Sequence, residues 1–222
     1  MGGWSSQATL RRAAVRGHDD AAGEGMRMTD GIGEALQQAV SATRGHFLYE
    51  SGHHGDLWLD LDSLVLDAGR MRGWAAVLAG RATGLGAEIV CGPLTGGAFL
   101  AQAIAAELEC DFVYAERVLE DGAVRYRIPA PLTATLAGRR VLVADDAINA
   151  GSALGLTLAE LSRHGAVPAG IACLLTLGEA AGRIAAAQGV PLLALAALQR
   201  GMWLQRDCPL CAAGLPLQDP AA

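Results

Sequence analysis

Short apolar segments alternate with amphipathic segments from residue 87 onward. The apolar segments predict buried strands, and the segments with an apolar residue at every third or fourth position predict helices. One such helix carries Leu100, Ile104 and Leu108 on one face, and another spans residues 152–164. Strands that alternate with helices are typical of a parallel sheet, so the pattern predicts an α/β fold with a central, mostly parallel sheet flanked by helices. The predicted strands are residues 88–91, 112–116, 140–144, 169–175 and 191–195.

The region before residue 87 is less regular. Residues 1–28 are rich in Gly, Ala, Ser and Arg without periodicity, and we interpret them as a disordered or mobile extension. We interpret residues 29–222 as one domain. Within it, apolar side chains at four-residue spacing predict a helix that begins at residue 29 or 30 and ends before residue 45. A short strand (57–62) and a second helix (71–83) are predicted to follow.

Residues 118–137 separate two predicted strands and contain the turn-forming pair Asp121-Gly122 together with two prolines. This composition predicts a hairpin or a mobile flap. Long loops on such sheets often carry function, so the segment is a candidate part of a site.

Composition narrows the classes of function. Hydrophobic residues make up 52% of the 222 residues and charged residues 18%, which excludes general disorder and suffices for one domain with a sizeable core. The net charge of −6 leaves no broad positive field, so we expect no nucleic-acid partner. All 17 basic residues are arginines, which excludes lysine Schiff-base chemistry and a P-loop lysine.

The most apolar stretch, residues 165–178, contains a proline and a threonine and is too short to span a membrane. The N-terminal arginines are followed by no apolar block, unlike a secretory signal. We therefore expect a cytoplasmic protein with no membrane partner. Cys91, Cys110 and Cys173 lie in apolar surroundings and are interpreted as small core residues in a reducing compartment.

The most informative segment follows the predicted strand 140–144. Asp145 and Asp146 come directly after the strand, and a turn of small residues then leads into a helix. Ligands of open α/β sheets bind beyond the carboxyl ends of the strands, where this acid pair falls. The N–H groups of the turn and the helix dipole suit a phosphate, and paired carboxylates suit the vicinal hydroxyls of a sugar. The segment therefore predicts a site for a phosphorylated ribose; the alternative is a pair of solvated acids beside an ordinary turn.

Residues 141–154 resemble the 5-phosphoribosyl-1-diphosphate (PRPP) binding signature of the type I phosphoribosyltransferases. From about residue 32 onward, the chain is most similar to the orotate phosphoribosyltransferases of bacteria. Residues 45–58 resemble the family's Gly-His-Phe to Ser-Gly-x-His stretch, and residues 92–97 its Gly-Pro-x-x-Gly-Gly turn. Glu116-Arg117 and Arg125 resemble the elements around its mobile flap. Taken singly, these could be a tight turn and solvated charges, but their order and spacing together favour the resemblance.

The resemblance implies a type I phosphoribosyltransferase fold with a small N-terminal hood (residues 29–66), a C-terminal tail and a mobile flap. It implies transfer of ribose 5-phosphate from PRPP to orotate, which gives orotidine 5'-phosphate and diphosphate in pyrimidine biosynthesis. The implied partners are PRPP, a nucleobase and a second copy of the chain in a homodimer. The implied cofactor is Mg²⁺, held through substrate and water rather than by protein ligands.

The resemblance also assigns roles to individual residues. Catalytic roles fall on Asp145, Asp146, Arg117 and Arg125. The implied PRPP-binding residues are Asp145, Asp146, Ala147, Ile148, Asn149, Ala150, Gly151, Ser152, Gly96, Gly97 and Arg117. The implied base-binding residues are Phe47, Ser51, Gly52 and Asn149.

Two positions on the base side depart from the family pattern. Asn149 stands where the family has the first threonine of its phosphate turn, and Leu177 stands where it has the arginine that pairs with the orotate carboxylate. Leucine cannot replace a bidentate guanidinium, and Arg183 is the nearest replacement downstream. Two further hypotheses therefore remain open: transfer to a different base, and a catalytically weak regulator that binds PRPP or a nucleotide.

Cys208 and Cys211 belong to a segment (208–216) that resembles the Cys-Pro-x-Cys-x-x-Gly-x-Pro tail of some bacterial members of the family. The pair has no second Cys-x-x-Cys and no neighbouring histidine in the sequence, which disfavours structural zinc and a redox role. We interpret it as a packed or dimer-contacting tail. His46, His53 and His54 could form a metal site, but the resemblance accounts for the first two without a metal.

Overall fold

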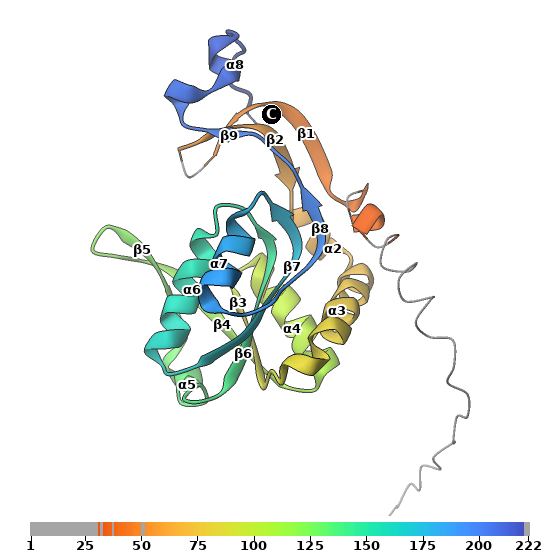
Figure 1. Cartoon of the computed structure of the whole chain (residues 1–222), viewed down its shortest axis with the longest axis vertical. Helices are drawn as coiled ribbons and strands as arrows, with labels where there is room; N and C mark the ends of the chain where they lie inside the picture. Colours follow the sequence, from red (N-terminus) through yellow and green to blue (C-terminus); the bar gives the residue numbers. More distant parts are fainter. Residues whose placement is uncertain (1–30, 32, 37, 50–51, 220–222) are drawn as a thin grey trace, which may run out of the picture.

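The computed structural model describes residues 31, 33–36, 38–49 and 52–219. It contains two sheets, which lie one above the other in Figure 1. The proposed extension, residues 1–28, lies outside the described residues. The larger sheet comprises β3 (Ile89–Pro93), β4 (Asp111–Glu120), β5 (Ala123–Arg127), β6 (Arg140–Ile148), β7 (Val167–Leu177) and β8 (Leu192–Leu198). The smaller sheet comprises β1 (Ser41–Leu48), β2 (His54–Asp60) and β9 (Met202–Trp203).

The larger sheet has the strand order β5-β4-β3-β6-β7-β8. All neighbours are parallel except β4 and β5, which form an antiparallel hairpin. This arrangement confirms the predicted α/β fold with a mostly parallel sheet. The helices are α2 (Asp62–Leu66), α3 (Ala68–Ala82), α4 (Gly96–Leu108), α5 (Ala130–Thr133), α6 (Ser152–Arg163), α7 (Ala180–Gln188) and α8 (Pro209–Ala212).

Side-chain alternation along the central strands builds a separate core on each face of the sheet. Val90 of β3 points into a cluster formed with α3 and α4, whereas its neighbours Ile89 and Cys91 point into a cluster formed with α6 and α7. A strand that is buried on both faces has a continuous run of apolar residues in its sequence. The apolar runs therefore predicted the central strands. Cys91 and Cys173 are fully buried in the second cluster, as expected for core residues, and burial raises the pKa of Cys91 to about 12.

The hood, expected at residues 29–66, shares a sheet with the C-terminal part of the chain, so from here on the name means the β1-β2-β9 sheet together with residues 204–219. β2 pairs antiparallel with both β1 and β9, so an N-terminal hairpin is completed by the C-terminal part of the chain. Gln218 N also donates to the His46 carbonyl oxygen at 2.7 Å. The residues before β1 bury Leu36, which is helical, and Val40 in the main core. The sequence pattern located the β2 strand only in part and did not locate β1.

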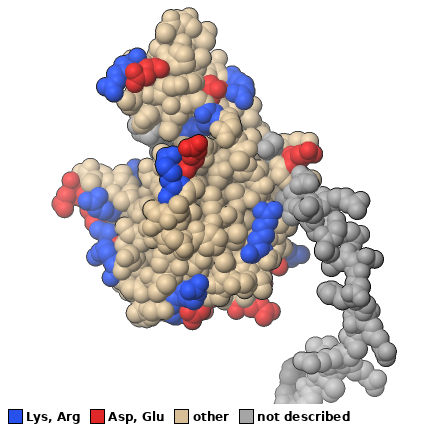
Figure 2. Space-filling view, viewed as in Figure 1, with Lys and Arg blue, Asp and Glu red and all other residues tan. Residues whose placement is uncertain are grey.

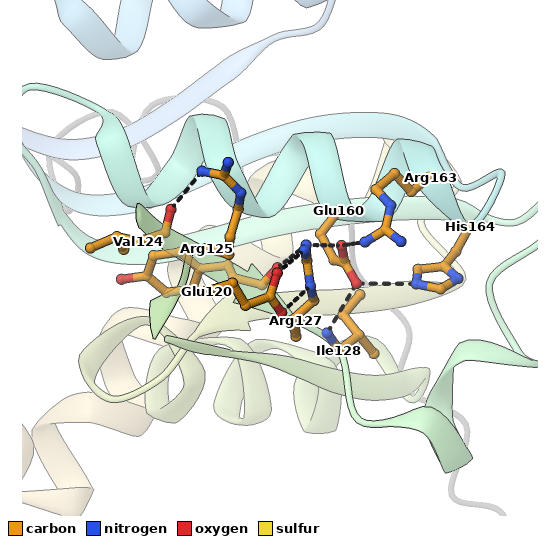
Figure 3. A network of polar contacts seen from close by, with 9 residues as sticks. Glu120, Val124, Arg125, Arg127, Ile128, Glu160, Arg163 and His164 are labelled. Carbon is orange, nitrogen blue, oxygen red and sulfur yellow. Dashed lines mark hydrogen bonds and ion pairs between the residues drawn. The ribbon is translucent and has the colours of Figure 1, made fainter. Parts of the chain in front are cut away.

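The segment predicted to be a hairpin or a flap is the β4–β5 hairpin followed by α5. Figure 3 shows how α6 holds the base of this hairpin. The Glu160 carboxylate of α6 accepts hydrogen bonds from Arg127 (2.9 Å), Arg163 (2.6 Å) and His164 (3.1 Å). Arg127 also pairs with Glu120 across the hairpin. The hairpin is therefore anchored at its base and projects beyond the sheet at its tip (Figure 1).

Charged side chains on the face seen in Figure 2 are scattered, and blue and red groups often lie side by side. Three of the ion pairs are Arg44–Asp56, Arg70–Asp67 and Arg183–Glu179. In the described part of the chain, no helix is both long and apolar enough to cross a membrane.

Candidate active site

The strand order places a topological switch point between β3 and β6. From β3 the chain passes to β4 on one side of it, and the later strands β6, β7 and β8 follow on the other side. The connections after β3 and β6 therefore diverge and leave room at the carboxyl ends of these strands. The two motifs that the sequence analysis singled out follow these two strands.

The structure brings the two motifs into contact. A Cβ added to Gly96 would lie 1.9 Å from Asp146 Oδ2, and one added to Gly97 would lie 2.7 Å from Asp145 Oδ1. Both distances are too short for a side chain, so the two glycines allow the start of α4 to approach the acid pair. Gly96, Gly97, Asp145 and Asp146 thus form a single site, although nearly fifty residues separate the two motifs in the sequence.

The acid pair carries charge that the described residues do not neutralise. Asp145 Oδ1 accepts from the Asp146 amide at 3.1 Å, and Asp146 Oδ1 accepts from the Ala147 amide at 2.7 Å. In the described part of the chain, neither carboxylate pairs with a cation. Burial raises the pKa of Asp145 well above its usual range, and the Asp146 charge adds to the effect; burial also raises the pKa of Asp146. A ligand that donates hydrogen bonds or brings positive charge would relieve this repulsion.

The turn after the acid pair ends in a free helix N-terminus. β6 continues through Ala147 and Ile148, both paired with β7, so the turn of small residues begins only after Ile148. It consists of Asn149, Ala150 and Gly151, and α6 begins at Ser152. Gly151 has a φ of 79° and an added Cβ would lie 2.4 Å from Ile184 Cδ1, so this position requires glycine.

Helix α6 has free N–H groups at this end. Its first internal hydrogen bond runs from the Gly155 amide to the Gly151 carbonyl at 2.8 Å. The amides of residues 152–154 consequently have no partner within the helix and point toward the turn. Together with the helix dipole, they form a site suited to a phosphate.

Arg117 and Arg125 lie on the β4–β5 hairpin and are both exposed. Arg117 pairs in register with Tyr126, and Arg125 with Val118. Because side chains alternate along a strand, the two arginines lie on opposite faces of the hairpin. The nearby Arg127 is held by Glu120 and Glu160 at the hairpin base.

The proposed base-binding residues are more dispersed. Phe47 is only 1% exposed and packs near Trp58 within the hood, with ring centroids 6.0 Å apart. Gly52 is exposed with a φ of 76°, and Ser51 lies outside the described residues. The Asn149 Oδ1 atom is buried without a hydrogen-bond partner in the described structure.

No arginine occupies the end of β7. Leu177 is buried at the end of that strand and pairs with Leu198 of β8. Arg183, the nearest downstream cation, forms an exposed ion pair with Glu179 on α7. Arg200 comes two residues after β8, and its guanidinium carbon lies 4.3 Å from the centroid of the Tyr49 ring. Sequence reasoning missed Arg200 because nothing in the sequence reveals that β8 ends beside β7.

The fold gives Cys208 and Cys211 neighbours that the sequence does not reveal. Cys208 and Cys211 have no histidine nearby in the sequence, but the fold places His46 and His54 against them. We call these four residues the His–Cys cluster. The histidines come from β1 and β2 and the cysteines from the tail, so only the closure of the hood brings them together. His53, the adjacent histidine, is not part of the cluster.

Comparisons with known sequences identify the family to which the chain is related. The sequence profile of the phosphoribosyl transferase domain matches residues 73–188. The chain is 27% identical over 189 residues to an orotate phosphoribosyltransferase from Caldanaerobacter subterraneus, covering 85% of this chain and 95% of that protein. It is also 27% identical over 186 residues to an orotate phosphoribosyltransferase from Thermus thermophilus, covering 84% and 97%.

Solved structures show the same fold. The orotate phosphoribosyltransferase from Aeropyrum pernix superposes with a TM-score of 0.59 at 23% identity, covering 75% of this chain and 93% of that chain. The adenine phosphoribosyltransferase from Rhodothermus marinus superposes with a TM-score of 0.61 at 21% identity, covering 76% and 99%.

The fold, the acid pair at the switch point and the free helix N-terminus define a type I phosphoribosyltransferase, an enzyme of the pentosyltransferase class. The chain belongs to the phosphoribosyl transferase domain family.

Proposed function

We propose that the protein transfers ribose 5-phosphate from PRPP to orotate, giving orotidine 5'-phosphate and diphosphate. The observation that carries the proposal is the contact between the acid pair and the Gly96-Gly97 turn at the switch point. Orotate is favoured as the base because the curated relatives that match most of the chain are orotate phosphoribosyltransferases.

Different residues of the site would bind different parts of PRPP. Asp145 and Asp146 accept hydrogen bonds from the ribose 2- and 3-hydroxyls, and ionised carboxylates accept such bonds most strongly. The amides at the start of α6 and the turn 149–151 hold the 5-phosphate. The amides of Gly96 and Gly97 approach the diphosphate closely because neither residue has a side chain.

The donor set at this site fits Mg²⁺ delivered with PRPP. Asp145 and Asp146 offer carboxylate oxygens, the ligand type that Mg²⁺ prefers, and they have no cationic partner in the described structure. Bound there, Mg²⁺ would neutralise charge on the diphosphate leaving group. The two carboxylates would hold it largely through water and the substrate.

The protein would then orient the base and stabilise the departing diphosphate. A nitrogen of the base attacks C1 of the ribose and releases its proton to water, while the bond from C1 to the diphosphate oxygen breaks and the diphosphate takes the electron pair. Arg117 or Arg125 would neutralise that charge when the hairpin lies over the site. Because the two arginines face opposite ways, a homodimer in which one of them serves the partner site is part of the proposal. We expect the enzyme to work in the cytoplasm.

A second candidate function is transfer to a base without a carboxylate. Leu177 favours it, because losing one charge-assisted contact would lower affinity for orotate by about tenfold to a hundredfold. Arg200 would argue for orotate instead if it supplied the missing charge, because it follows β8, the strand that pairs with Leu177. The unpartnered Asn149 amide oxygen could then accept a hydrogen bond from the base.

Titration calorimetry with PRPP and Mg²⁺, followed by orotate in the same sample, tests the proposal. We expect PRPP to bind alone and orotate then to release diphosphate. PRPP binding without turnover of orotate, but with turnover of adenine or another base, would establish the second candidate. Binding of PRPP without turnover of any base would indicate a regulator, and no PRPP binding would contradict the whole assignment.

Arg200 gives the base assignment a sharper test. In an Arg200→Ala variant, we expect the KM for orotate to rise about tenfold while the KM for PRPP stays within twofold of the parent. Arg183→Ala is the matched control, because its guanidinium forms only an exposed pair on α7. Equal changes for both substrates would exclude a contact between Arg200 and the base.

A further inference from the structure

We propose that His46, His54, Cys208 and Cys211 bind one zinc ion that fastens the C-terminal tail to the N-terminal hairpin of the hood. One potential ligand atom from each of these residues lies within 4.8 Å of all the others. The set contains two imidazole nitrogens and two thiol sulfurs, one of the usual combinations in structural zinc sites. The proposal is independent of the function of the acid pair.

Two of the nitrogen–sulfur distances in the cluster match tetrahedral coordination, and the other distances are slightly shorter. A zinc ion with Zn–S bonds of about 2.3 Å and Zn–N bonds of about 2.0 Å holds its nitrogen and sulfur ligands about 3.6 Å apart. His46 Nε2 lies 3.5 Å from Cys208 Sγ and 3.6 Å from Cys211 Sγ. His54 Nδ1 lies 3.2 Å from Cys211 Sγ and 2.8 Å from His46 Nε2. Only a small outward movement of the nitrogens would be needed to admit the ion.

The tautomer of His46 is fixed in the form that binds a metal. His46 Nδ1 lies 2.7 Å from the carbonyl oxygen of Leu215, which can only accept a hydrogen bond. Nδ1 therefore carries the proton, which leaves Nε2, close to His54 Nδ1 and to both cysteine sulfurs, as the atom for a metal. A backbone carbonyl that orients a histidine ligand in this way is a usual feature of zinc sites.

The backbone of the tail also suits metal binding. The Cys-Pro-Leu-Cys segment turns tightly, with the Ala212 amide donating to the Cys208 carbonyl at 3.1 Å. The Gly214 amide donates to the Cys211 carbonyl at 2.9 Å, and Gly214 itself has a φ of 69°. These turns direct both sulfurs toward the histidines.

Four protein ligands leave no open position on a tetrahedral ion, so the site would be structural rather than catalytic. The ligands are also well shielded, since three of the four residues are buried and Cys211 is partly buried. Binding would release the thiol protons to solvent and leave two thiolates on the ion.

The hood needs such a fastening because it has little hydrophobic core of its own. Its buried apolar side chains are Phe47, Leu57 and Cys208, and none of them belongs to either core cluster of the main sheet. Only two residues of β9 pair with β2. Small structural units of this kind commonly depend on a metal or disulfides.

Metal content of the freshly purified full-length chain is the first test, measured by mass spectrometry for all transition metals. We expect about one zinc per chain, and little or none in a Cys208→Ser/Cys211→Ser variant. Cys110→Ser is the matched control, because Cys110 is a partly buried thiol outside the cluster. Stoichiometric iron or copper in place of zinc would contradict the proposal, as would a Cys208–Cys211 disulfide.

Cobalt substitution covers the case in which the double variant fails to fold. In the unmutated chain, Co²⁺ should give the visible bands of a tetrahedral ion and a near-ultraviolet sulfur-to-cobalt charge-transfer band. Zinc should displace cobalt and abolish both. A chain that takes up neither metal, or binds cobalt without the sulfur band, would overturn the proposal.

Discussion

The main sheet and the hood are stabilised in different ways. The main sheet has an apolar cluster on each face, and its central strands are buried on both sides. The hood has two antiparallel pairings and few buried apolar side chains, and polar groups occupy its centre. Apart from Phe47 and Leu57, the buried side chains of the hood belong to the His–Cys cluster. The fold of the sheet thus depends mainly on the hydrophobic effect, whereas the closure of the hood depends on specific side chains.

A bound ligand should therefore affect the stability of the hood more than that of the main sheet. A site at the edge of a well-packed sheet can carry unfavourable charge, because the cores below it provide ample stabilisation. A small unit without a core cannot tolerate the loss of its few specific contacts. The predictions below test this contrast, beginning with the largest expected effect.

The largest effect should follow zinc removal. With the metal chelated, we expect amide hydrogen exchange in residues 41–60 and 202–218 to accelerate about a thousandfold, equivalent to about 4 kcal/mol of opening free energy. Exchange in β3, β6 and β7 should stay unchanged, because their cores do not include the cluster. PRPP binding should persist. Equal acceleration in both regions would refute the contrast between them.

Loss of the Glu160 carboxylate should destabilise the main sheet and its flap. Its side chain is 2% exposed and bonded to Arg127, Arg163 and His164. Glu160→Gln should cost about 3 kcal/mol of unfolding free energy, measured by denaturant titration at neutral pH. Glu179→Gln, whose pair with Arg183 is exposed, should cost less than about 0.5 kcal/mol. Similar costs for both would show that burial of the network does not matter.

The effect of Glu160 should depend on pH. Burial would raise the pKa of Glu160, but hydrogen bonds from His164, Arg163 and the Ile128 amide outweigh it, so the pKa lies below its ordinary value of 4.5. A depressed carboxyl pKa stabilises the fold above the unfolded-state pKa, and this stabilisation is lost as the pH falls through the folded-state pKa. The difference between parent and variant should therefore shrink below about pH 4.5. A constant difference would contradict an ionic origin.

The acid pair should show opposite effects on binding and stability. Asp145→Asn should weaken PRPP binding about tenfold to a hundredfold, since it removes a charge-assisted contact. The same variant should melt at a higher temperature than the parent at neutral pH. The folded-state pKa of Asp145 is raised, so its ionisation opposes folding increasingly as the pH rises from the ordinary value of 3.8.

Two controls test whether the higher melting temperature of Asp145→Asn comes from the loss of an ionised carboxylate. The gain in melting temperature should disappear at pH values below the ordinary carboxyl pKa, where Asp145 is protonated in both states. Glu107→Gln, which alters an exposed carboxylate on α4, should change neither melting temperature nor PRPP binding. A destabilised Asp145→Asn would show that the carboxylate stabilises the empty enzyme.

The smallest effects should come from the flap arginines. Arg117→Ala and Arg125→Ala should each lower kcat by about tenfold, the value of one charge-assisted contact in the transition state. Because the side chains lie on opposite faces of the hairpin, the double variant should show the product of the two factors. Steady-state kinetics on the parent, the two single variants and the double variant would measure these changes in kcat. A double variant no worse than either single variant would mean that both act on the same contact.

Sequence patterns predicted the parts of the fold that periodicity controls. The central strands have continuous apolar runs because both faces are buried, and the acid pair and glycine turn have local signatures. β1 has mostly exposed residues in its first half, so it has no apolar pattern to find. Helix α7 is short and consists mostly of alanine, and its sequence did not predict a helix either.

The His–Cys cluster shows the limit of sequence reasoning more clearly. Zinc motifs are recognised by pairs of ligands at short spacings, but here two of the ligands lie more than 150 residues from the others. Nothing local marks His46 or His54 as partners of Cys208. The contact arises only because β2 pairs with β9 and brings the tail back to the first hairpin. Tertiary structure, rather than composition, creates the site.

The pairing of β2 with β9 also determines the order in which the protein can be completed during translation. Ribosomes release the β1–β2 hairpin early, but its partners β9 and α8 are encoded after every strand of the main sheet. The hairpin must therefore wait, with unpaired edges, until nearly the whole chain has been synthesised. Although its first two strands are among the first to be made, the hood can be completed only after β8, and a chain that ends before residue 208 contains every strand of the main sheet but neither cysteine of the cluster.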